Sequence, residues 1–332
     1  MPVGLMLGCV SGTPIEYWVR DKADVAACGN ITGRCWNASQ SPNTGLSNLY
    51  RTHIQPFVTA GLGISAIVWD QAEADVGCHD HTSQQPSRLG DDPTYACLER
   101  AMITGWRQAF TRAPPTHQST PSPIPWVGVQ LPGYQAGQFT SKNGVFSMRL
   151  GQANGIMHVP LAGVVPTYDL SCPECPWGSI HPTDKQDVGA RIALYLRVLV
   201  RKDPRVTVFA GPEVASASAA SGPDNTSVVS VQLSGDGQPF AMRPTRNCTD
   251  CCAVGGSDFG VSVDGGERWV MANAPGRIVG MSVQFSVNLT LNATSKALVR
   301  YTAARGFPQC AVVNAQGLPA APFQTEVHAL HQ

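Results

Sequence analysis

The sequence has little charge, no net charge and no long apolar run. Only 14% of its 332 residues are charged, and 23 basic side chains balance 23 acidic ones. No block of basic residues with interleaved aromatic residues occurs, so nothing favours a nucleic acid or an anionic surface as partner. No segment reaches the roughly 18 consecutive apolar residues that a membrane-spanning helix needs. We therefore expect no membrane span and no nucleic-acid partner.

The chain also lacks a recognisable secretory signal. Its first ten residues, MPVGLMLGCV, have no basic region and are short for a signal peptide. Yet 11 cysteines and a set of Asn-x-Ser/Thr sequons favour an oxidising, secretory compartment. The sequons lie at Asn30, Asn37, Asn225, Asn247, Asn288 and Asn292. We expect a secreted or lysosomal glycoprotein whose natural N-terminus is missing from this chain.

The cysteine spacing suggests local disulfides and an unpaired thiol. The candidate pairs are Cys28 with Cys35, Cys78 with Cys97, and Cys172 with Cys175. Cys172 and Cys175 also fit a redox motif or half of a zinc site, but no second Cys-x-x-Cys lies at zinc-ribbon spacing. We expect structural bridges, and neither a metal ion nor a cofactor.

The hydrophobic pattern changes about two thirds of the way along the chain. Up to residue 203, short apolar runs alternate with helical patterns, which predicts an α/β domain with a parallel sheet. The runs are Val3–Cys9, Ile64–Trp69, Val127–Leu131 and Val159–Leu170, and the helices Leu49–Ala60 and Ala96–Phe110. From residue 204 to 332, runs separated by turn residues predict an antiparallel β domain. These runs are Val206–Phe209, Val228–Leu233, Phe259–Val263, Val279–Val287 and Leu298–Thr302.

One histidine lies at a predicted junction between a loop and a helix, in the stretch GSIHPTDKQDVGAR from 178 to 191. Pro182 suits the first turn of a helix and Asp184 suits its dipole, so the helix should begin just after His181. Its apolar face comprises Val188, Ile192, Tyr195, Leu196 and Leu199. A side chain held at such a junction can be a general base, although a capping or core histidine is the alternative.

Two other segments are predicted to reach the same edge of the sheet. Asp70 to Asp75, reading DQAEAD, directly follows a predicted strand, and ligands of such sheets bind beyond the carboxyl ends of the strands. Gly12 lies in a turn after the first apolar run, and Thr13 with Glu16 fits a capping box that starts a helix. The alternatives are a plain turn at Gly12 and a solvated Glu73.

Six segments together resemble the sialate O-acetylesterases, a branch of the SGNH hydrolase superfamily. Besides GSIHPTDKQDVGARIAL they are GLMLGCVSGTPIEYW, HIQPFVTAGLGISAIVWDQAEAD, ITGWRQAF, WVGVQLPGY and QCAVVNAQGLPAAPF, in the order of the family. An R-x-x-Q element of the family matches Arg149 and Gln152. The resemblance implies an SGNH-like three-layer parallel sheet followed by an antiparallel β domain, and hydrolysis of acetyl esters on sugars.

The resemblance also implies roles for four residues. His181 would be the general base with Glu73 in support, and Gly12 would donate to the oxyanion. The family pattern W-Y-Q-G-E-S-N is altered here to W-D-Q-A-E-A-D, so Asp75 takes the place of an oxyanion-binding amide. An ionised carboxylate only accepts hydrogen bonds, so this change weakens the oxyanion hole. The usual acid three residues before the histidine is replaced by Gly178, and Asp169 and Asp184 are further candidate partners.

The family's serine nucleophile, in a G-Q-S-N-M block, is absent from the chain. No G-x-S-x-G motif replaces it, and Cys9 is a weaker substitute because a buried free cysteine more often behaves as a small hydrophobic residue. Two hypotheses follow: an incomplete carbohydrate O-acetylesterase, or an inactive relative that serves as a binding or structural glycoprotein. A sheet without its first strand would also leave an edge open to another chain.

Overall fold

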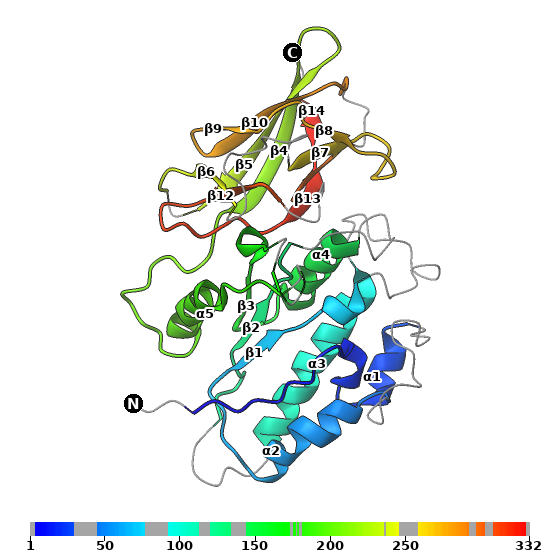
Figure 1. The fold of residues 1–332 in the computed structure, drawn as a ribbon, viewed down its shortest axis with the longest axis vertical. Coiled ribbons are helices and arrows are strands. Elements are labelled where there is room, and N and C mark those ends of the chain that lie inside the picture. The colour runs from blue at the N-terminus through cyan, green and yellow to red at the C-terminus, as the bar shows by residue number, and fades with distance from the viewer. Residues whose placement is uncertain are drawn as a thin grey trace.

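A computed structural model of the chain describes residues 4–29, 45–76, 92–112, 120–133, 144–172, 175–176, 178, 181–235, 237–245, 258–291, 297–302 and 308–329. In Figure 1 helices surround a small sheet in one half of the molecule, and strands fill the other half. The change falls between Leu199, where the last helix ends, and Glu213, where the next strand begins. The predicted class, a parallel α/β unit followed by antiparallel strands, is therefore confirmed at this level.

The first unit is built on a parallel sheet with the strand order β1-β2-β3. The strands are β1 (Ile67–Asp70), β2 (Trp126–Val129) and β3 (Ala162–Val165). The helices are α1 (Lys22–Ala27), α2 (Gln55–Thr59), α3 (Pro93–Arg112), α4 (Gly144–Ile156) and α5 (Lys185–Leu199). A π-helical turn over Tyr50–Ile54 runs directly into α2, so the predicted helix over 49–60 forms in two parts.

Alternate residues of the strands face two different helical layers. Ile67, Trp69 and Trp126 belong to the core that α2 and α3 cover, whereas Val127 packs with residues of α5. Because successive side chains of a strand point to opposite faces, Val68 projects toward the side on which α5 lies. The layers are therefore helices, sheet and helix, and α5 contacts β2 and β3.

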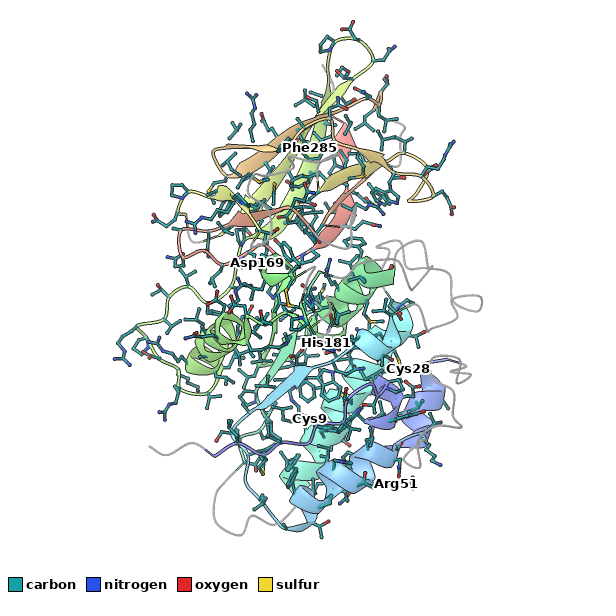
Figure 2. All side chains as sticks on the ribbon, in the orientation of Figure 1. Cys9, Cys28, Arg51, Asp169, His181 and Phe285 are labelled. Atoms are coloured by element: carbon teal, nitrogen blue, oxygen red, sulfur yellow. A yellow bond between two sulfur atoms is a disulfide. The ribbon has the colours of Figure 1, made fainter. Side chains whose placement is uncertain are left out.

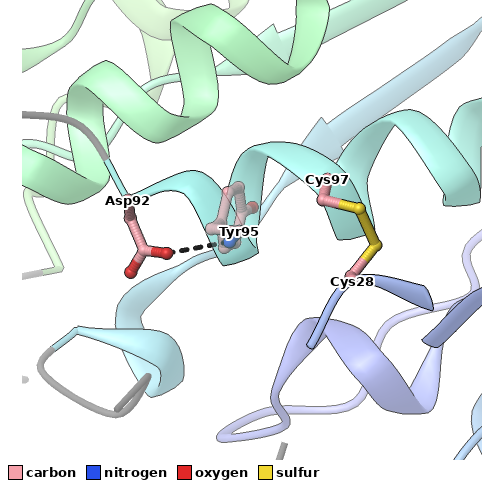
Figure 3. Close-up of a disulfide and its surroundings, with 4 residues drawn as sticks. All are labelled: Cys28, Asp92, Tyr95 and Cys97. Atoms are coloured by element: carbon pink, nitrogen blue, oxygen red, sulfur yellow. Dashed lines mark hydrogen bonds between the residues drawn. A yellow bond between two sulfur atoms is a disulfide. The ribbon is translucent and has the colours of Figure 1, made fainter. Parts of the chain in front are cut away.

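The helix α3 begins at a sequence signal for helix initiation. Asp92 accepts a hydrogen bond from Tyr95 N at 2.8 Å, and Pro93 is the first helical residue, where its missing N–H costs nothing (Figure 3). A disulfide joins Cys97 of this helix to Cys28, just after α1. The predicted pairs Cys28–Cys35 and Cys78–Cys97 are therefore wrong, because spacing along the chain does not show how α1 packs on α3. Cys35 and Cys78 lie outside the described residues.

The predicted disulfide between Cys172 and Cys175 is confirmed. It closes a tight loop just before the His181 segment. The two disulfides are consistent with an oxidising compartment. Within the described residues no helix is both long and apolar enough to cross a membrane.

The strand predicted over residues 3–9 does not form in the described part of it, residues 4–9. Leu5 is 85% and Leu7 80% exposed, and on β1, the edge strand of the sheet, Val68 is 44% exposed. An apolar sequence forms a strand when a neighbouring strand pairs with it, and none pairs with this segment among the described strands. Among the described strands, β1 lies at one edge of this sheet, and whether a further strand belongs there stays a prediction.

The second unit consists of antiparallel sheets around their own core. Their strand orders are β14-β4-β5-β10-β9, β13-β11-β7-β8 and β12-β6, and among the described strands of this unit only the short β14 runs parallel to its neighbour, β4. The bounds are β4 (Glu213–Ser221), β5 (Ser227–Ser234), β6 (Ala241–Pro244), β7 (Phe259–Ser262), β8 (Val270–Met271), β9 (Arg277–Val279), β10 (Ser282–Val287), β11 (Leu298–Tyr301), β12 (Cys310–Val313), β13 (Phe323–Glu326) and β14 (His328–Ala329).

Four of the five runs predicted after residue 204 contain strands. The run at 279–287 contains a turn at Gly280 between β9 and β10, and the run Val206–Phe209 is not a strand. The stretch from 206 to 209 instead belongs to the connection from α5, and Phe209 packs edge-on against Tyr195 of that helix.

One tyrosine connects the two units. Tyr168 follows β3 in the chain, yet it is fully buried in the core of the second unit. Its hydroxyl lies 3.2 Å from the Tyr301 hydroxyl and donates to Ala320 O at 2.9 Å. The type of secondary structure changes between residues 199 and 213, but the Tyr168 side chain packs across that change, so the division at 203/204 stays a prediction.

Candidate active site

His181 lies in the loop that leads into α5, beside the end of β1 in Figure 2. Its backbone N–H donates to Gly178 O at 3.0 Å, and its side chain is exposed. The helix begins later than the sequence predicts, at Lys185, because Asp184 is the N-cap and accepts from Asp187 N at 3.1 Å. His181 is therefore a loop residue held between a tight turn and a capped helix.

The Gly12 turn lies against the segment that follows β1. Gly12 has a φ of 66°, a conformation that glycine adopts without strain. The predicted capping box does not form: Thr13 Oγ1 donates to Val10 O at 2.8 Å and accepts from Trp18 Nε1 at 3.0 Å. The following helix is only a short 3₁₀ turn over Ile15–Tyr17.

Two side chains after β1 hold this turn in place. Asp75 is 0% exposed, and its Oδ2 accepts from Ile15 N at 3.2 Å. Gln71 donates both to Asp75 and, at 2.9 Å, to Thr13 O. The Asp75 carboxylate is therefore hydrogen-bonded both to the backbone just after the Gly12 turn and to Gln71. The assignment of Asp75 to the oxyanion hole stays a prediction, and its observed partners indicate that it positions Gly12.

Glu73 and His181 are close enough to interact electrostatically. Burial, and then the charge of Asp70, raise the pKa of the half-buried Glu73, while His181 and Lys185 lower it. Burial also raises the pKa of Asp70, although much of that residue is exposed, and Lys185 and then His181 oppose this shift. The carboxyl end of β1 and the start of α5 therefore form one charged cluster of Asp70, Glu73, His181 and Lys185.

Arg149 and Gln152 of α4 hold the neighbouring strand ends. Gln152 Nε2 donates to Gln71 O at 2.9 Å and to Val129 O at 3.0 Å, so it joins the ends of β1 and β2. The buried Arg149 donates from Nε to Leu131 O at 2.9 Å. Burial lowers the pKa of Arg149 to about 10. The R-x-x-Q element thus fixes the geometry of this edge of the sheet.

The structure brings Gly12, Glu73, Asp75 and His181 to the carboxyl edge of the sheet. Asp169 and Asp184, the other candidate partners of His181, are engaged elsewhere: Asp169 forms a two-pronged ion pair with Arg191, and Asp184 caps α5. Sequence reasoning placed Asp70 at this edge without assigning it a role, and it missed Lys185. A signal was present, since both residues fall at ends of predicted elements. Cys9 is exposed on the unpaired segment before the Gly12 turn.

Comparison with known proteins relates the chain to esterases. It is 29% identical over 217 residues to the sialate O-acetylesterase of Homo sapiens, covering 64% of this chain and 38% of that protein. The enzymes of that name from Pongo abelii and Rattus norvegicus are each 28% identical, over 219 and 231 residues. No protein-family profile matches the chain. The chain is thus a distant homologue of sialate O-acetylesterases and aligns with about two fifths of their length.

A solved structure has the same fold. A carbohydrate acetylesterase from Xanthomonas citri superposes with a TM-score of 0.63 and 22% sequence identity, covering 95% of this chain and 59% of that one. At this identity the likeness concerns the fold alone. It extends over both units, so the parallel sheet with its antiparallel partner is the arrangement found in that esterase.

Proposed function

We propose that this chain carries most of the catalytic edge of an ester hydrolase that removes acetyl groups from sugars. The observation that supports this most directly is the meeting of the Gly12 turn, the segment after β1 and the His181 loop, which come from three distant parts of the sequence. The homology to sialate O-acetylesterases supports acetylated sugars as the substrate class.

In this proposal the chemistry is acyl transfer through a serine. The serine oxygen attacks the acetyl carbonyl while its proton passes to His181, and the sugar oxygen leaves with that proton. Water then attacks the acetyl-serine, again through His181, and releases acetate. The Gly12 N–H would donate to the oxyanion, and Glu73 would stabilise the imidazolium. Removal of one oxyanion donor typically costs about 3 to 4 kcal/mol of transition-state stabilisation.

We place the serine on a strand at the open edge of β1. Ile67 N donates to Pro125 O, next to β2, and the N–H and C=O of a strand residue point the same way. The backbone groups of Val68 and Asp70 therefore point away from β2, where a further parallel strand could pair. That strand would end beside Glu73 and His181. It would be supplied by a polypeptide segment outside these 332 residues, which is the partner we propose for this edge.

The second candidate function is that of an inactive relative that binds or supports other molecules in the secretory pathway. Two departures from the family pattern favour it. Asp75 stands where the family has an amide, and its carboxylate is engaged with Ile15 N. Ala72 stands where the family has glycine and has a φ of 136°, a strained conformation for alanine.

Hydrolysis of a chromogenic acetyl ester by the purified chain separates these candidates. We expect no turnover by the chain alone, because it lacks the serine, and turnover once a peptide that carries the serine strand is supplied. His181→Ala should abolish that turnover, and His328→Ala, which changes an exposed histidine on β14, should leave it unchanged. Turnover that survives His181→Ala would refute the role of His181. If turnover appears only when the serine strand is supplied, the result supports the esterase. If the chain stays inactive in the presence of that strand, the result supports the inactive relative.

A further inference from the structure

A buried tyrosine of α3 lies behind the segment that follows β1. The backbone of Tyr95 is fixed at the start of the helix, where Asp92 accepts a hydrogen bond from Tyr95 N (Figure 3). Its hydroxyl lies 3.2 Å from Gln71 Oε1 and 3.5 Å from Gln71 O. Because Tyr95 is fully buried, it cannot touch a substrate, but it contacts a side chain that holds the Gly12 turn.

The hydrogen bonds of the Tyr95 hydroxyl have a fixed direction. Trp69 Nε1 can only donate, and it lies 3.4 Å from the hydroxyl oxygen, which therefore accepts from it. The single O–H hydrogen is then available for Gln71, whose Oε1 is the nearer of the two oxygens. Burial, and then the charges of Glu99 and Asp75, raise the pKa of Tyr95 well above its usual value. The hydroxyl therefore keeps this hydrogen at neutral pH.

The side-chain amide of Gln71 continues this series of hydrogen bonds to the turn. With Oε1 accepting from Tyr95, the Nε2 of the same amide donates to Thr13 O at 2.9 Å and to Asp75. Asp75 also accepts from Ile15 N at 3.2 Å. A reversed amide would set Oε1 against Thr13 O and the Asp75 carboxylate, which are acceptors themselves. One directional series of hydrogen bonds therefore runs from α3 to the backbone of the turn.

We propose that Tyr95 is a positioning residue that holds the Gly12 turn through Gln71. This inference rests on the proposed function, in which the Gly12 N–H donates to the oxyanion. It also gives a structural role to the acidic residue at position 75. Gln71 Nε2 and Ile15 N both donate to that side chain, and a carboxylate accepts both because its two oxygens are acceptors. Asp75 thus supports the turn at the position where the family pattern has an amide.

The first test compares two variants that each remove one buried hydroxyl. Tyr95→Phe removes the hydrogen bond to Gln71. Tyr50→Phe is the matched control, because Tyr50 lies in the same core and its hydroxyl has no hydrogen-bond partner within the described residues. In amide NMR spectra of the full 332-residue chain, Tyr95→Phe should shift the Gly12 and Ile15 N–H signals, and Tyr50→Phe should leave them in place. Unmoved signals in Tyr95→Phe would overturn the proposal, as would equal shifts in the two variants.

A double variant tests whether Tyr95 acts through Gln71. Gln71→Met keeps an unbranched side chain and removes the hydrogen bonds to Tyr95, Thr13 and Asp75. It should shift the same N–H signals, and adding Tyr95→Phe to it should cause no further shift, because residues that act through one another are not additive. Shifts that add up in the double variant would show that Tyr95 reaches the turn by another route, which would refute the proposal.

A measurement on the unaltered chain does not depend on how a variant folds. The Tyr95 hydroxyl proton should appear in the NMR spectrum as a slowly exchanging signal that is close in space to the Gln71 side-chain amide, because it is buried and hydrogen-bonded. A hydroxyl proton that exchanges too fast to be observed would contradict this geometry.

The effect on turnover is measured in the ester assay with the serine strand supplied. Tyr95→Phe should lower kcat by about 10- to 100-fold with little change in KM, because it shifts an oxyanion donor and leaves the substrate-binding groups in place. Tyr50→Phe should leave both constants unchanged. A rise in KM with an unchanged kcat would contradict the positioning role. The NMR measurements need no turnover, so a failure of the proposed esterase function is seen separately in this assay.

Discussion

Glu99 offers a sharp test of the packing beneath the sheet. This residue of α3 is 1% exposed, and within the described part of the chain its Oε2 has no hydrogen-bond partner. Two glycines make room for it: a Cβ at Gly155 would lie 2.3 Å from Oε2, and one at Gly128 would lie 3.6 Å from Oε1. Burial raises the pKa of this carboxyl well above its usual value, and only the charge of Arg100 opposes the shift.

The sign of the pH dependence follows from that shift. In the unfolded chain the carboxyl ionises near pH 4, about its usual value, whereas in the folded chain it stays protonated to a much higher pH. The contribution of the Glu99 carboxyl to stability is therefore fully present at acid pH and is lost as the pH rises toward the pKa of the folded state. In this window the loss approaches about 1.4 kcal/mol for each pH unit, the limit for one proton. The side chain of Glu99→Gln cannot ionise, so the unfolding free energy of this variant lacks this pH dependence.

The assay is urea unfolding followed by tryptophan fluorescence from about pH 5 to about pH 8. Trp18, Trp69, Trp106 and Trp126 pack in one cluster of this core and report on it. We expect the difference in unfolding free energy between Glu99→Gln and wild type to grow in favour of the variant as the pH rises. The exposed Glu267→Gln should show no such trend. A Glu99→Gln difference that is independent of pH would refute the burial of an ionisable Glu99.

Two further predictions concern the turn at the site and the junction of the units. Asp75→Ala should lower the unfolding free energy by about 1 to 3 kcal/mol, because it leaves the buried Ile15 N–H without its acceptor. Asp75→Asn keeps an acceptor at this position and should cost less. Equal losses for the two variants in urea unfolding would contradict this. Tyr168→Phe removes the hydrogen bond to Ala320 O and the contact with the Tyr301 hydroxyl, so it should cost about 1 to 2 kcal/mol and be visible by calorimetry in the melting of the β unit. An unchanged melting temperature would show that this contact does not stabilise the junction.

The positions of the candidate-site segments could be predicted from sequence because they depend on local signals. A buried strand followed by polar residues predicts the edge near Glu73, and a helix with a clear apolar face predicts the loop that holds His181. The start of α5 was misplaced by a few residues, because Asp184 serves as a side-chain cap instead of a first-turn charge. The local sequence allows Asp184 to be either the N-cap or a residue of the first turn, and the hydrogen bond from Asp187 N to Asp184 Oδ1 shows that it is the N-cap.

Other features could not be predicted because they depend on partners distant in sequence. The disulfide of Cys28 is formed with a residue 69 positions away, on a helix whose packing the spacing does not reveal. The strand β4, EVASASAAS, has small side chains and little hydrophobicity, and it forms because β5 pairs along its length. Asp70 was placed at this edge from the sequence, but the face of β1 that it occupies depends on how the strand packs.

Within the proposed function, one explanation covers both the segment 4–9, which forms no strand, and the serine that this function requires. Residues 4–10 lead into Thr13 and Ile15, which are hydrogen-bonded to the segment just after β1, so this stretch and β1 arrive at the same end of the sheet. A strand inserted between them would pair on one side with the backbone groups of Val68, which pair with no described strand, and on the other side with residues 4–8. It would also cover Leu5 and Leu7, whose exposure is costly in water. The segment that completes the sheet would then be the one that brings the serine to His181, so that folding of this edge and assembly of the catalytic site become the same event.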